Sequence, residues 1–184
     1  MATLPIVIYP APILKRPAKP VATITDATRR ILADMAETMY AAPGVGLAAP
    51  QVGVASRLCV VDVGEPVPSL DRTESAPTHA KLYQLINPAI VERSEELVDA
   101  EEGCLSIPHF RIVMRRHAIV TVRATDPEGR RNEVHGHGLL SVALQHENDH
   151  LDGKLIIDSL SQLKQEQYLR QMKQPSRDHE AGEL

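Results

Sequence analysis

The sequence predicts an α+β fold in which short, mostly antiparallel strands surround a central helix around residues 139–150. A further helix is expected towards each end of the chain. Apolar residues recur at helical spacing in separated stretches, which predicts these helices. Between the outer helices lie short runs of β-branched and other apolar residues bounded by prolines, glycines and asparagines, a pattern typical of strands joined by turns.

The composition is that of an ordinary globular protein, with 184 residues, of which 43% are hydrophobic and 24% charged. We expect one domain over residues 1–184, with a flexible tail at 174–184. The net charge of −4 offers no basic footprint, so specific DNA binding is not expected. Neither a signal peptide nor a membrane span is visible. A cytoplasmic protein in which Cys59 and Cys104 are reduced is therefore expected.

The first part of the chain is predicted to be an extended arm followed by a helix. Five prolines within residues 1–22 forbid a long helix and favour an arm on the domain surface. Thr25 or Asp26 then fits a helix N-cap. The helix should end near residues 40–42, before Pro43. Its apolar face consists of Ile31, Leu32, Met35 and Met39.

Residues 44–51, with the sequence Gly-Val-Gly-Leu-Ala-Ala-Pro-Gln, superficially fit a dinucleotide-binding fingerprint. That fingerprint should follow a strand and open a helix, whereas this stretch follows a helix, and Pro50 would interrupt any helix that began at Gly46. We therefore reject nucleotide binding. Two interpretations stay open: a tight turn from helix to strand, or a glycine loop that lets a substrate backbone approach closely, with Gln51 as an amide donor.

Short strands should make up most of the middle of the chain. They are expected at residues 57–63, 82–86, 89–91, 112–114, 119–124 and 132–135, with a turn at 126–129. Cys59 fits a packed core residue better than a ligand. Residues 64–81 lack periodicity and predict a long surface loop. After Gly153 we expect a short extended piece at 155–157 and a charged helix at 161–173.

The central helix carries a His-Glu-x-x-His pattern within residues 145–153. On a helix, His146 and His150 lie one turn apart on the same face, where both imidazoles can bind a single metal ion. Glu147 can reach a water bound to that metal and is the natural general base. Gly153 follows at a plausible helix C-terminus, which makes a chance match less plausible.

The same face of this helix is apolar. It consists of Leu139, Val142 and Ala143, followed by His146 and His150. The two histidines therefore continue the core-facing side of the helix. Because a buried imidazole needs a partner, a metal ion would complete this face.

A catalytic metal site usually has three protein ligands and one open position for water. Residues 101–108 have the sequence Glu-Glu-Gly-Cys-Leu-Ser-Ile-Pro, and Cys104 in it is the best upstream candidate for the third ligand. In a zincin-like peptidase the third ligand would lie downstream instead. The downstream candidates are Asp152, Asp158, Glu166, His179, Glu180 and Glu183, of which the last three lie in the expected tail. His135 and His137 are further candidates for metal ligands. Because neighbouring glycines predict a turn there, we favour the interpretation that these histidines are solvated or support the ligands from outside.

Three separated stretches, residues 44–51, 102–106 and 145–153, closely resemble the three signature motifs of peptide deformylases. They occur in the order of that family and at fitting separations, and the similarity extends from about residue 4 to about residue 170. Two departures are modest. The loop at 64–81 is longer than in compact members, and His137 stands where an acidic residue is more usual.

The resemblance implies that Cys104, His146 and His150 bind one divalent metal ion, with a water or hydroxide as the fourth ligand. Family members typically use Fe(II), and zinc, nickel or cobalt can substitute; the ligand set alone does not decide among them. The implied reaction is the hydrolysis of the N-formyl group from the N-terminal methionine of newly synthesised polypeptides, which releases formate.

The resemblance also implies roles for other residues. Glu147 would take a proton from the attacking water and deliver it to the leaving amine. The side-chain amide of Gln51 and the backbone N–H of Leu105 would stabilise the tetrahedral oxyanion together with the metal. The backbone around Val45 and Gly46 would pair with an extended substrate.

A methionine pocket is implied beside His146, and Arg111 would line the substrate cleft. The pocket residues are Val45, Leu139, Val142 and Ala143. The expected substrates are formyl-methionyl nascent peptides, and the expected state is a monomer.

The last helix contains Lys164, Arg170 and Lys173, which offer a contact with the ribosome, although such basic content also fits a solvated face. Two rival functions stay open. One is a metallopeptidase that cleaves ordinary amide bonds; the other is a non-catalytic module that binds formylated termini or holds a structural metal. Glu147 argues against the second rival, because a structural site needs only ligands.

Overall fold

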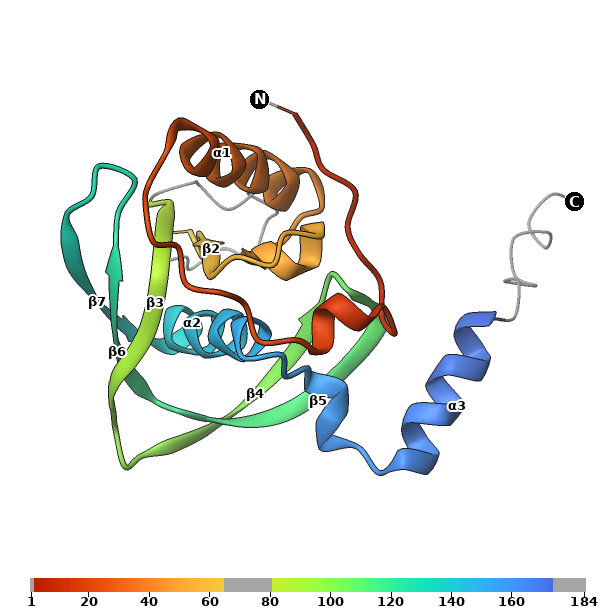
Figure 1. Cartoon of the computed structure of the whole chain (residues 1–184). Helices are drawn as coiled ribbons and strands as arrows, with labels where there is room; N and C mark the ends of the chain where they lie inside the picture. The colour runs from red at the N-terminus through yellow and green to blue at the C-terminus, as the bar shows by residue number, and fades with distance from the viewer. Residues whose placement is uncertain (1, 65–80, 174–184) are drawn as a thin grey trace, which may run out of the picture.

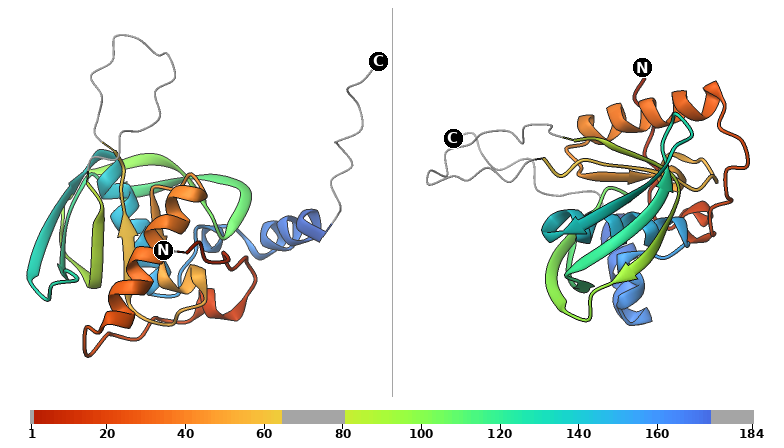
Figure 2. Two further views of the ribbon diagram at one scale, coloured as in Figure 1. Left: turned by 90° about the horizontal axis from the view of Figure 1, so that it is seen from above. Right: turned by 90° about the vertical axis from the view of Figure 1, so that its left-hand side faces the viewer.

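The computed structural model describes residues 2–64 and 81–173 of the chain. Helix α2 (Gly138–Leu151) lies at the centre, and the strands are arranged around it (Figure 1). Helix α1 (Asp26–Ala41) and helix α3 (Gln162–Lys173) lie on opposite sides of the molecule (Figure 2). Every pair of neighbouring strands is antiparallel. The predicted α+β fold with antiparallel strands around a central helix is confirmed.

In the described part of the chain the strands form two sheets. The larger sheet has five strands in the order β1-β2-β3-β6-β7, and the smaller one pairs β4 with β5. The bounds are β1 Gly46–Ala48, β2 Leu58–Val61, β3 Tyr83–Arg93, β4 Leu97–Cys104, β5 Ile107–His117, β6 Ile119–Thr125 and β7 Arg131–His137.

Helix α1 forms where the sequence predicts it. The Thr25 hydroxyl accepts a hydrogen bond from the Thr28 N–H at 3.3 Å, which satisfies one of the free donors at the helix start. Its buried face packs against strands β1 and β2 in a cluster that consists of Leu32, Met35, Met39, Leu47, Ala49, Leu58, Val60 and Ile86. The predicted helix end near residue 41 is confirmed.

Helix α2 packs against the inner face of the larger sheet. Its residues Ala143, Leu144 and Leu151 join a core cluster with valines of β6 and β7. The helix approaches β7 closely, because a Cβ atom built at Gly136 would lie 2.7 Å from Cδ1 of Leu144. Gly138 then starts the helix with a φ of +54°, a conformation that favours glycine. These contacts place the histidine-bearing helix inside the molecule.

The N-terminal arm and the last elements meet in a third cluster. The arm is extended except for a 3₁₀ turn, η1 (Pro12–Lys15), and Leu14 of this turn is fully buried. Two more 3₁₀ turns, η2 (Ala49–Val52) and η3 (Ile156–Ser159), follow later. The third cluster consists of Leu14, Ile107, Leu155, Ile156, Ile157 and Tyr168. Tyr168 thereby attaches α3 to the rest of the molecule.

Two strand predictions were wrong in detail. Residues 82–86 and 89–91 form one strand, β3, instead of two. Asn87 adopts a φ of +53°, and its side chain binds both the N–H and the carbonyl of Val21. The strand therefore continues through Asn87 with only a shift of register between Ile86 and Ala89. Strand β4 was not predicted, because its inner positions include Glu102 and its alternation is therefore not apolar.

Other corrections concern short segments. Strand β5 extends well beyond the predicted residues 112–114, because exposed arginines on its outer face hide its alternation in the sequence. The segment from His135 to His137 belongs to strand β7 and is no turn. Residues 156–159 form the 3₁₀ turn η3, so the extended piece predicted at 155–157 was wrong beyond Leu155. The Asp158 side chain accepts from the Leu155 N–H and closes that turn.

Two predicted segments fall largely outside the described residues. These are the loop at 64–81, of which only Gly64 and Lys81 are described, and the tail at 174–184. The division of the chain into one domain with a tail stays a prediction. Among the described helices, none is both long and apolar enough to cross a lipid bilayer.

The packing of α2 predicts a contrast between two of its leucines. Replacing Leu144, which is fully buried, with Ala should lower the free energy of unfolding by about 2–5 kcal/mol, because it removes buried surface and leaves a cavity. The control Leu139→Ala, at a position 54% exposed, should change it by less than about 0.5 kcal/mol. Denaturant unfolding measures both, and equal losses would contradict the described packing.

Candidate metal centre

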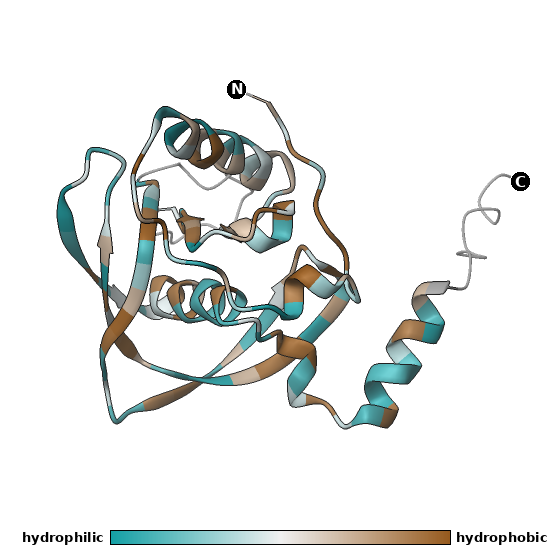
Figure 3. Ribbon diagram, viewed as in Figure 1, coloured by the Kyte–Doolittle hydropathy of each residue, from teal (hydrophilic) through white to brown (hydrophobic). Residues whose placement is uncertain are grey.

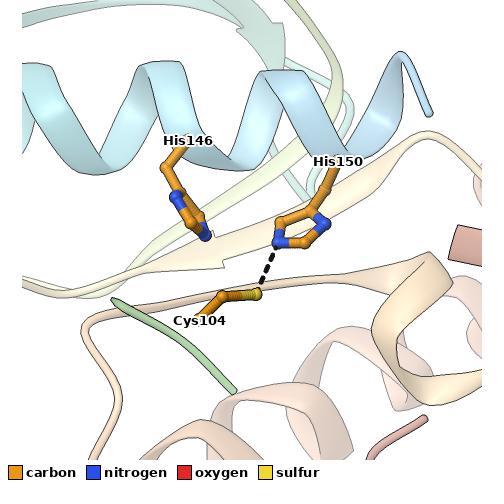
Figure 4. A group of neighbouring side chains, drawn as sticks. All are labelled: Cys104, His146 and His150. Carbon is orange, nitrogen blue, oxygen red and sulfur yellow. Dashed lines mark hydrogen bonds between the residues drawn. The ribbon is translucent and has the colours of Figure 1, made fainter. Parts of the chain in front are cut away.

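Three side chains converge at the centre of the molecule. His146 and His150 come from successive turns of α2, with ring centroids 4.9 Å apart, and Cys104 comes from the end of β4 (Figure 4). Their ligand atoms all lie within 4.8 Å of one another, and Sγ of Cys104 is 3.2 Å from Nε2 of His150. A thiolate and two imidazoles fit zinc, iron and related transition metals, so these residues could hold such an ion.

Local structure explains why Cys104 reaches this place. It ends β4, pairs with Ile107, and is followed by a tight turn at Leu105 and Ser106. The strand register shifts between Gly103 and Cys104, which takes the cysteine out of regular pairing. The structure thus brings Cys104 together with both histidines, as a shared metal site requires, and its role as the third ligand stays a prediction. Cys59, in contrast, is fully buried in the core cluster beneath α2, as predicted.

The downstream alternatives for the third ligand do not join this group. Asp152 pairs with Arg57 at 2.8 Å, and Asp158 pairs with Lys15. Glu166 lies on α3, with Arg170 at 4.0 Å. Among the residues that the structure describes, Cys104, His146 and His150 form the one cluster with suitable geometry. His179, Glu180 and Glu183 lie outside those residues.

A buried ion-pair network supports His146. Nδ1 of His146 lies 2.8 Å from Oε2 of Glu102, which leaves Nε2 of the ring for a metal. Arg116 on β5 binds both carboxylate oxygens of Glu102, at 2.6 and 3.0 Å, and also Asp149 on α2 at 2.6 Å. The network therefore joins β4, β5 and α2 around the centre.

The same contacts set the charge states of the network. Burial would raise the pKa of Glu102, but hydrogen bonds from Arg116 and His146 lower it below its usual value. Burial would lower the pKa of His146, but in the metal-free chain its contacts with Cys104 and Glu102 raise it well above its usual value. Binding of a metal, which needs a neutral imidazole, should therefore release a proton from this site.

Sequence reasoning missed Glu102 and Arg116 as parts of the site. Glu102 adjoins the cysteine motif, but Glu101 beside it looks the same in the sequence and points outwards. Only the alternation along β4, which puts Glu102 on the inner face, separates the two. No sequence signal marks Arg116 among the neighbouring arginines of β5.

Glu147 is a buried carboxylate in an unusual environment. It is 3% exposed, and its Oε2 has no hydrogen-bond partner among the described residues. Burial raises its pKa from 4.5 to about 7; His146 opposes that shift, while Glu102 and Asp149 add to it. A carboxylate of this kind can both accept and donate a proton near neutral pH.

Gly46 leaves the space that Glu147 occupies. A Cβ atom at position 46 would lie 2.3 Å from Oε1 of Glu147, which is far inside contact distance. The glycine is therefore needed for the close approach of the Glu147 carboxylate, which the sequence did not predict, and the approach of a substrate backbone to this glycine loop stays a prediction. This loop forms the short strand β1 and the 3₁₀ turn η2.

Gln51 in η2 is held in a defined orientation. Its Oε1 accepts from the Ala48 N–H at 2.8 Å, so its amide Nε2 points towards the centre. That nitrogen lies 3.5 Å from Sγ of Cys104 and 3.3 Å from Oγ of Ser106. Its donor group thus lies beside the turn that carries Leu105.

The centre opens into a cleft of about 610 Å³. The cleft is lined by every residue predicted to contact substrate: Val45, Gly46, Arg111, Leu139, Val142 and Ala143. Val142 and Ala143 are buried, whereas Val45 and Leu139 are exposed apolar side chains. The prediction that Leu139 faces the core was therefore wrong, because it lies in the first turn of α2 at the cleft. Arg111 is also exposed and forms a long ion pair with Glu101.

At the base of the cleft, a Cys-His-His group lies beside a buried carboxylate. This combination is typical of metal-dependent hydrolases, and it places the chain in that class of protein. The comparisons with known proteins are specific. The family model described as polypeptide deformylase matches residues 3–166. The chain therefore belongs to the polypeptide deformylase family.

Curated relatives and solved structures agree with this assignment. A peptide deformylase from Azotobacter vinelandii is 44% identical over 97% of this chain and 99% of its own. One from Rhizobium meliloti is 45% identical over 92% of each chain. The crystal structure of peptide deformylase from Ehrlichia chaffeensis is 35% identical and superposes with a TM-score of 0.85, covering 94% of this chain and 96% of that one.

The ion-pair network predicts a difference between two adjacent glutamates. Glu102→Gln should weaken metal affinity by roughly 10- to 100-fold, because His146 loses its anionic partner. Glu101→Gln is the matched control, since this side chain is 63% exposed and forms an ion pair with Arg111 instead of with His146 or Arg116. Competition with a chromogenic chelator measures both affinities. Equal affinities for the two variants would contradict the supporting role of Glu102.

The raised pKa of Glu147 predicts a pH-dependent stability in the metal-free chain. As pH rises from 4.5 to about 7, the carboxyl ionises in the unfolded state before it does so in the folded state, so folding becomes less favourable. Glu147→Gln removes this loss. The variant should gain stability over wild type through that range, on the order of 3 kcal/mol in total. Urea unfolding of chelator-treated protein measures the difference, and a pH-independent difference would contradict the burial argument.

Proposed function

We propose that this chain hydrolyses the N-formyl group from the N-terminal methionine of newly synthesised polypeptides and releases formate. Family membership supports the reaction class. The observation that carries the proposal is the buried carboxylate of Glu147, whose Oε2 has no hydrogen-bond partner among the described residues, next in sequence to His146 of the Cys104, His146 and His150 group.

The proposal assigns the metal to Cys104, His146 and His150, with Fe(II) as the native ion and zinc, nickel or cobalt as substitutes. When bound, the ion would act as a Lewis acid towards the formyl oxygen and lower the pKa of a bound water. The thiolate and two imidazoles are compatible with each of these metals, and Glu102 would keep His146 in the tautomer that binds through Nε2.

Glu147 is proposed as the general base and then the general acid. It would accept a proton from the attacking water and later transfer it to the nitrogen of the leaving amine. A pKa of about 7 suits both steps, because the group is partly ionised near neutral pH and re-protonates readily. The space beside Gly46 allows its carboxylate to lie within the cleft.

Gln51 and Leu105 are proposed to stabilise the oxyanion that develops on the formyl oxygen. The Gln51 amide is oriented in advance by the Ala48 N–H and therefore needs little reorganisation during the reaction. Leu105 follows Cys104 in the turn of the β4–β5 hairpin, so its backbone N–H is fixed by the same turn.

The cleft is proposed to bind the peptide in an extended conformation. The backbone of Val45 and Gly46 would pair with the substrate backbone, since edge pairing gives affinity without reading side chains. A methionine side chain would be held by Val142 and Ala143 beside His146, with Val45 and Leu139 at the mouth. Arg111 would contact the substrate further along the cleft.

The proposal extends to the cell, where we expect a cytoplasmic monomer that acts on nascent chains. In the described part of α3, the basic residues Lys164 and Arg170 are exposed. A ribosome contact through this helix, including Lys173, stays a prediction beside the simpler interpretation of a solvated face.

Formate release tests the proposed reaction. Protein purified without oxygen and reconstituted with Fe(II) should release formate from a formyl-methionyl tripeptide, and should leave acetyl-methionyl and unblocked tripeptides intact. Glu147→Ala should retain metal but lose turnover by roughly a hundredfold or more, because it removes the proton-transfer group. Glu166→Ala, on the exposed surface of α3, is the control and should retain activity.

Other results would support one of the rival functions. Cleavage of an internal amide bond without formate would assign the chain to the metallopeptidases. Bound metal with no turnover of any of the three peptides would favour a binding module or a structural metal site. Unchanged turnover in Glu147→Ala would rule out the role assigned to that carboxylate. Reconstitution with zinc, nickel or cobalt in parallel tests the choice of Fe(II).

A further inference from the structure

The N-terminal arm crosses the two loops that carry the proposed oxyanion donors. The Val7 N–H donates to the carbonyl of Gln51 at 2.7 Å, and the Tyr9 N–H donates to the carbonyl of Ser106 at 2.9 Å. Successive residues of an extended chain point their N–H groups to opposite sides, so residues 7 and 9 bind partners on the same side. Three residues of the arm thereby connect η2 with the β4–β5 turn.

These two loops have weaker direct connections to each other. The Gln51 amide lies 3.3 Å from Oγ of Ser106 and 3.5 Å from Sγ of Cys104. The first distance exceeds the usual length of a hydrogen bond from an amide to an oxygen, and the second leads to sulfur, which is a weak acceptor. The two backbone hydrogen bonds made by the arm are of ordinary strong length. The arm therefore provides the tighter connection between the two loops.

The arm is itself held in place along its length. The Leu4 N–H donates to the Thr38 hydroxyl on α1 at 2.9 Å. Val7 and Tyr9 pack against the third core cluster, and so does the partly buried Cys104. The arm is hydrophobic over much of its length (Figure 3). It therefore has a fixed position of its own and can transmit that position to both loops.

We propose that Val7 and Tyr9 form a positioning clamp, which fixes the distance between the Gln51 amide and the backbone N–H of Leu105. This inference rests on the proposed function, in which these two groups stabilise the oxyanion. Ser106 adjoins Leu105, so holding its carbonyl also holds the turn. Hydrogen-bond donors stabilise a transition state only when they are pre-arranged, and misplacement by about 1 Å can lower a rate by roughly a hundredfold.

The clamp predicts a loss of kcat without a matching change in KM. Val7→Pro removes the N–H that binds Gln51 and should lower kcat by about tenfold, because donors that act in the transition state are loosened. KM and bound metal should change by less than about twofold. Ile8→Pro is the matched control, since the Ile8 N–H donates to no group in the described part of the chain. That variant should retain the kcat of wild type.

A double-mutant cycle separates positioning from general destabilisation. If the arm acts through Gln51, its effect on kcat should shrink to less than about twofold in a Gln51→Met background, where the amide is already absent. A merely structural effect would lower kcat by the same factor in both backgrounds. Thermal midpoints and metal content are measured for all four proteins of the cycle. If Val7→Pro shows no cooperative unfolding transition, the α-hydroxy acid analogue of valine at position 7 replaces it, because the resulting ester lacks the N–H that binds Gln51 but keeps the side chain.

Three results would overturn the clamp while leaving the proposed function intact. These are equal losses of kcat in both backgrounds, an equal loss in Ile8→Pro, and an unchanged kcat in a folded Val7 variant. Absence of formate release by the wild-type protein would instead overturn the proposed function, and the clamp with it. The two failures are therefore distinguishable in one set of assays.

Discussion

The bidentate ion pair between Arg116 and Glu102 is the interaction on which the candidate metal centre depends. Both side chains are buried, and burying a charge is costly unless its hydrogen-bonding groups are satisfied. Here Glu102 binds Arg116 and His146, and Arg116 also binds Asp149, so no charge in the network lacks a partner. The pair fixes the β4–β5 hairpin against α2, and this geometry lets Cys104 meet the two histidines.

The polar interior is tolerable because apolar packing surrounds it. Leu144 and Leu151 anchor one side of α2 against the larger sheet, so another side can carry His146 and His150. Two buried atoms, Oε2 of Glu147 and Nδ1 of His150, have no partner among the described residues. Buried polar atoms without partners are rare, and their presence at one place is typical of a functional site.

Much of this arrangement could be predicted from the sequence. The three helices and the grouping of Cys104 with His146 and His150 follow from local spacing and motif resemblance. The closeness of Gly46 to Glu147 was not predicted, because the two residues are distant in sequence. Strand β4 and the single strand β3 could not be predicted, because Glu102 interrupts the apolar alternation and Asn87 looks like a turn residue. Their structure depends on partners distant in sequence, Arg116 for Glu102 and Val21 for Asn87, which no local pattern reveals. The same applies to Leu139, whose exposure follows from the cleft in front of it.

The hydrogen bonds of the arm also constrain how the chain can fold. Val7 can find Gln51 early, but Tyr9 must wait for Ser106, and the Ala18 N–H binds the carbonyl of Leu151. Tyr9 and Ala18 thus acquire these partners only when the chain as far as Leu151 is available. Contacts of such long sequence separation slow folding, since the entropy of closing the loop is lost before the contacts form. The arm should therefore dock late, over a body already assembled, and its docking would be the step at which the folded chain becomes a competent catalyst.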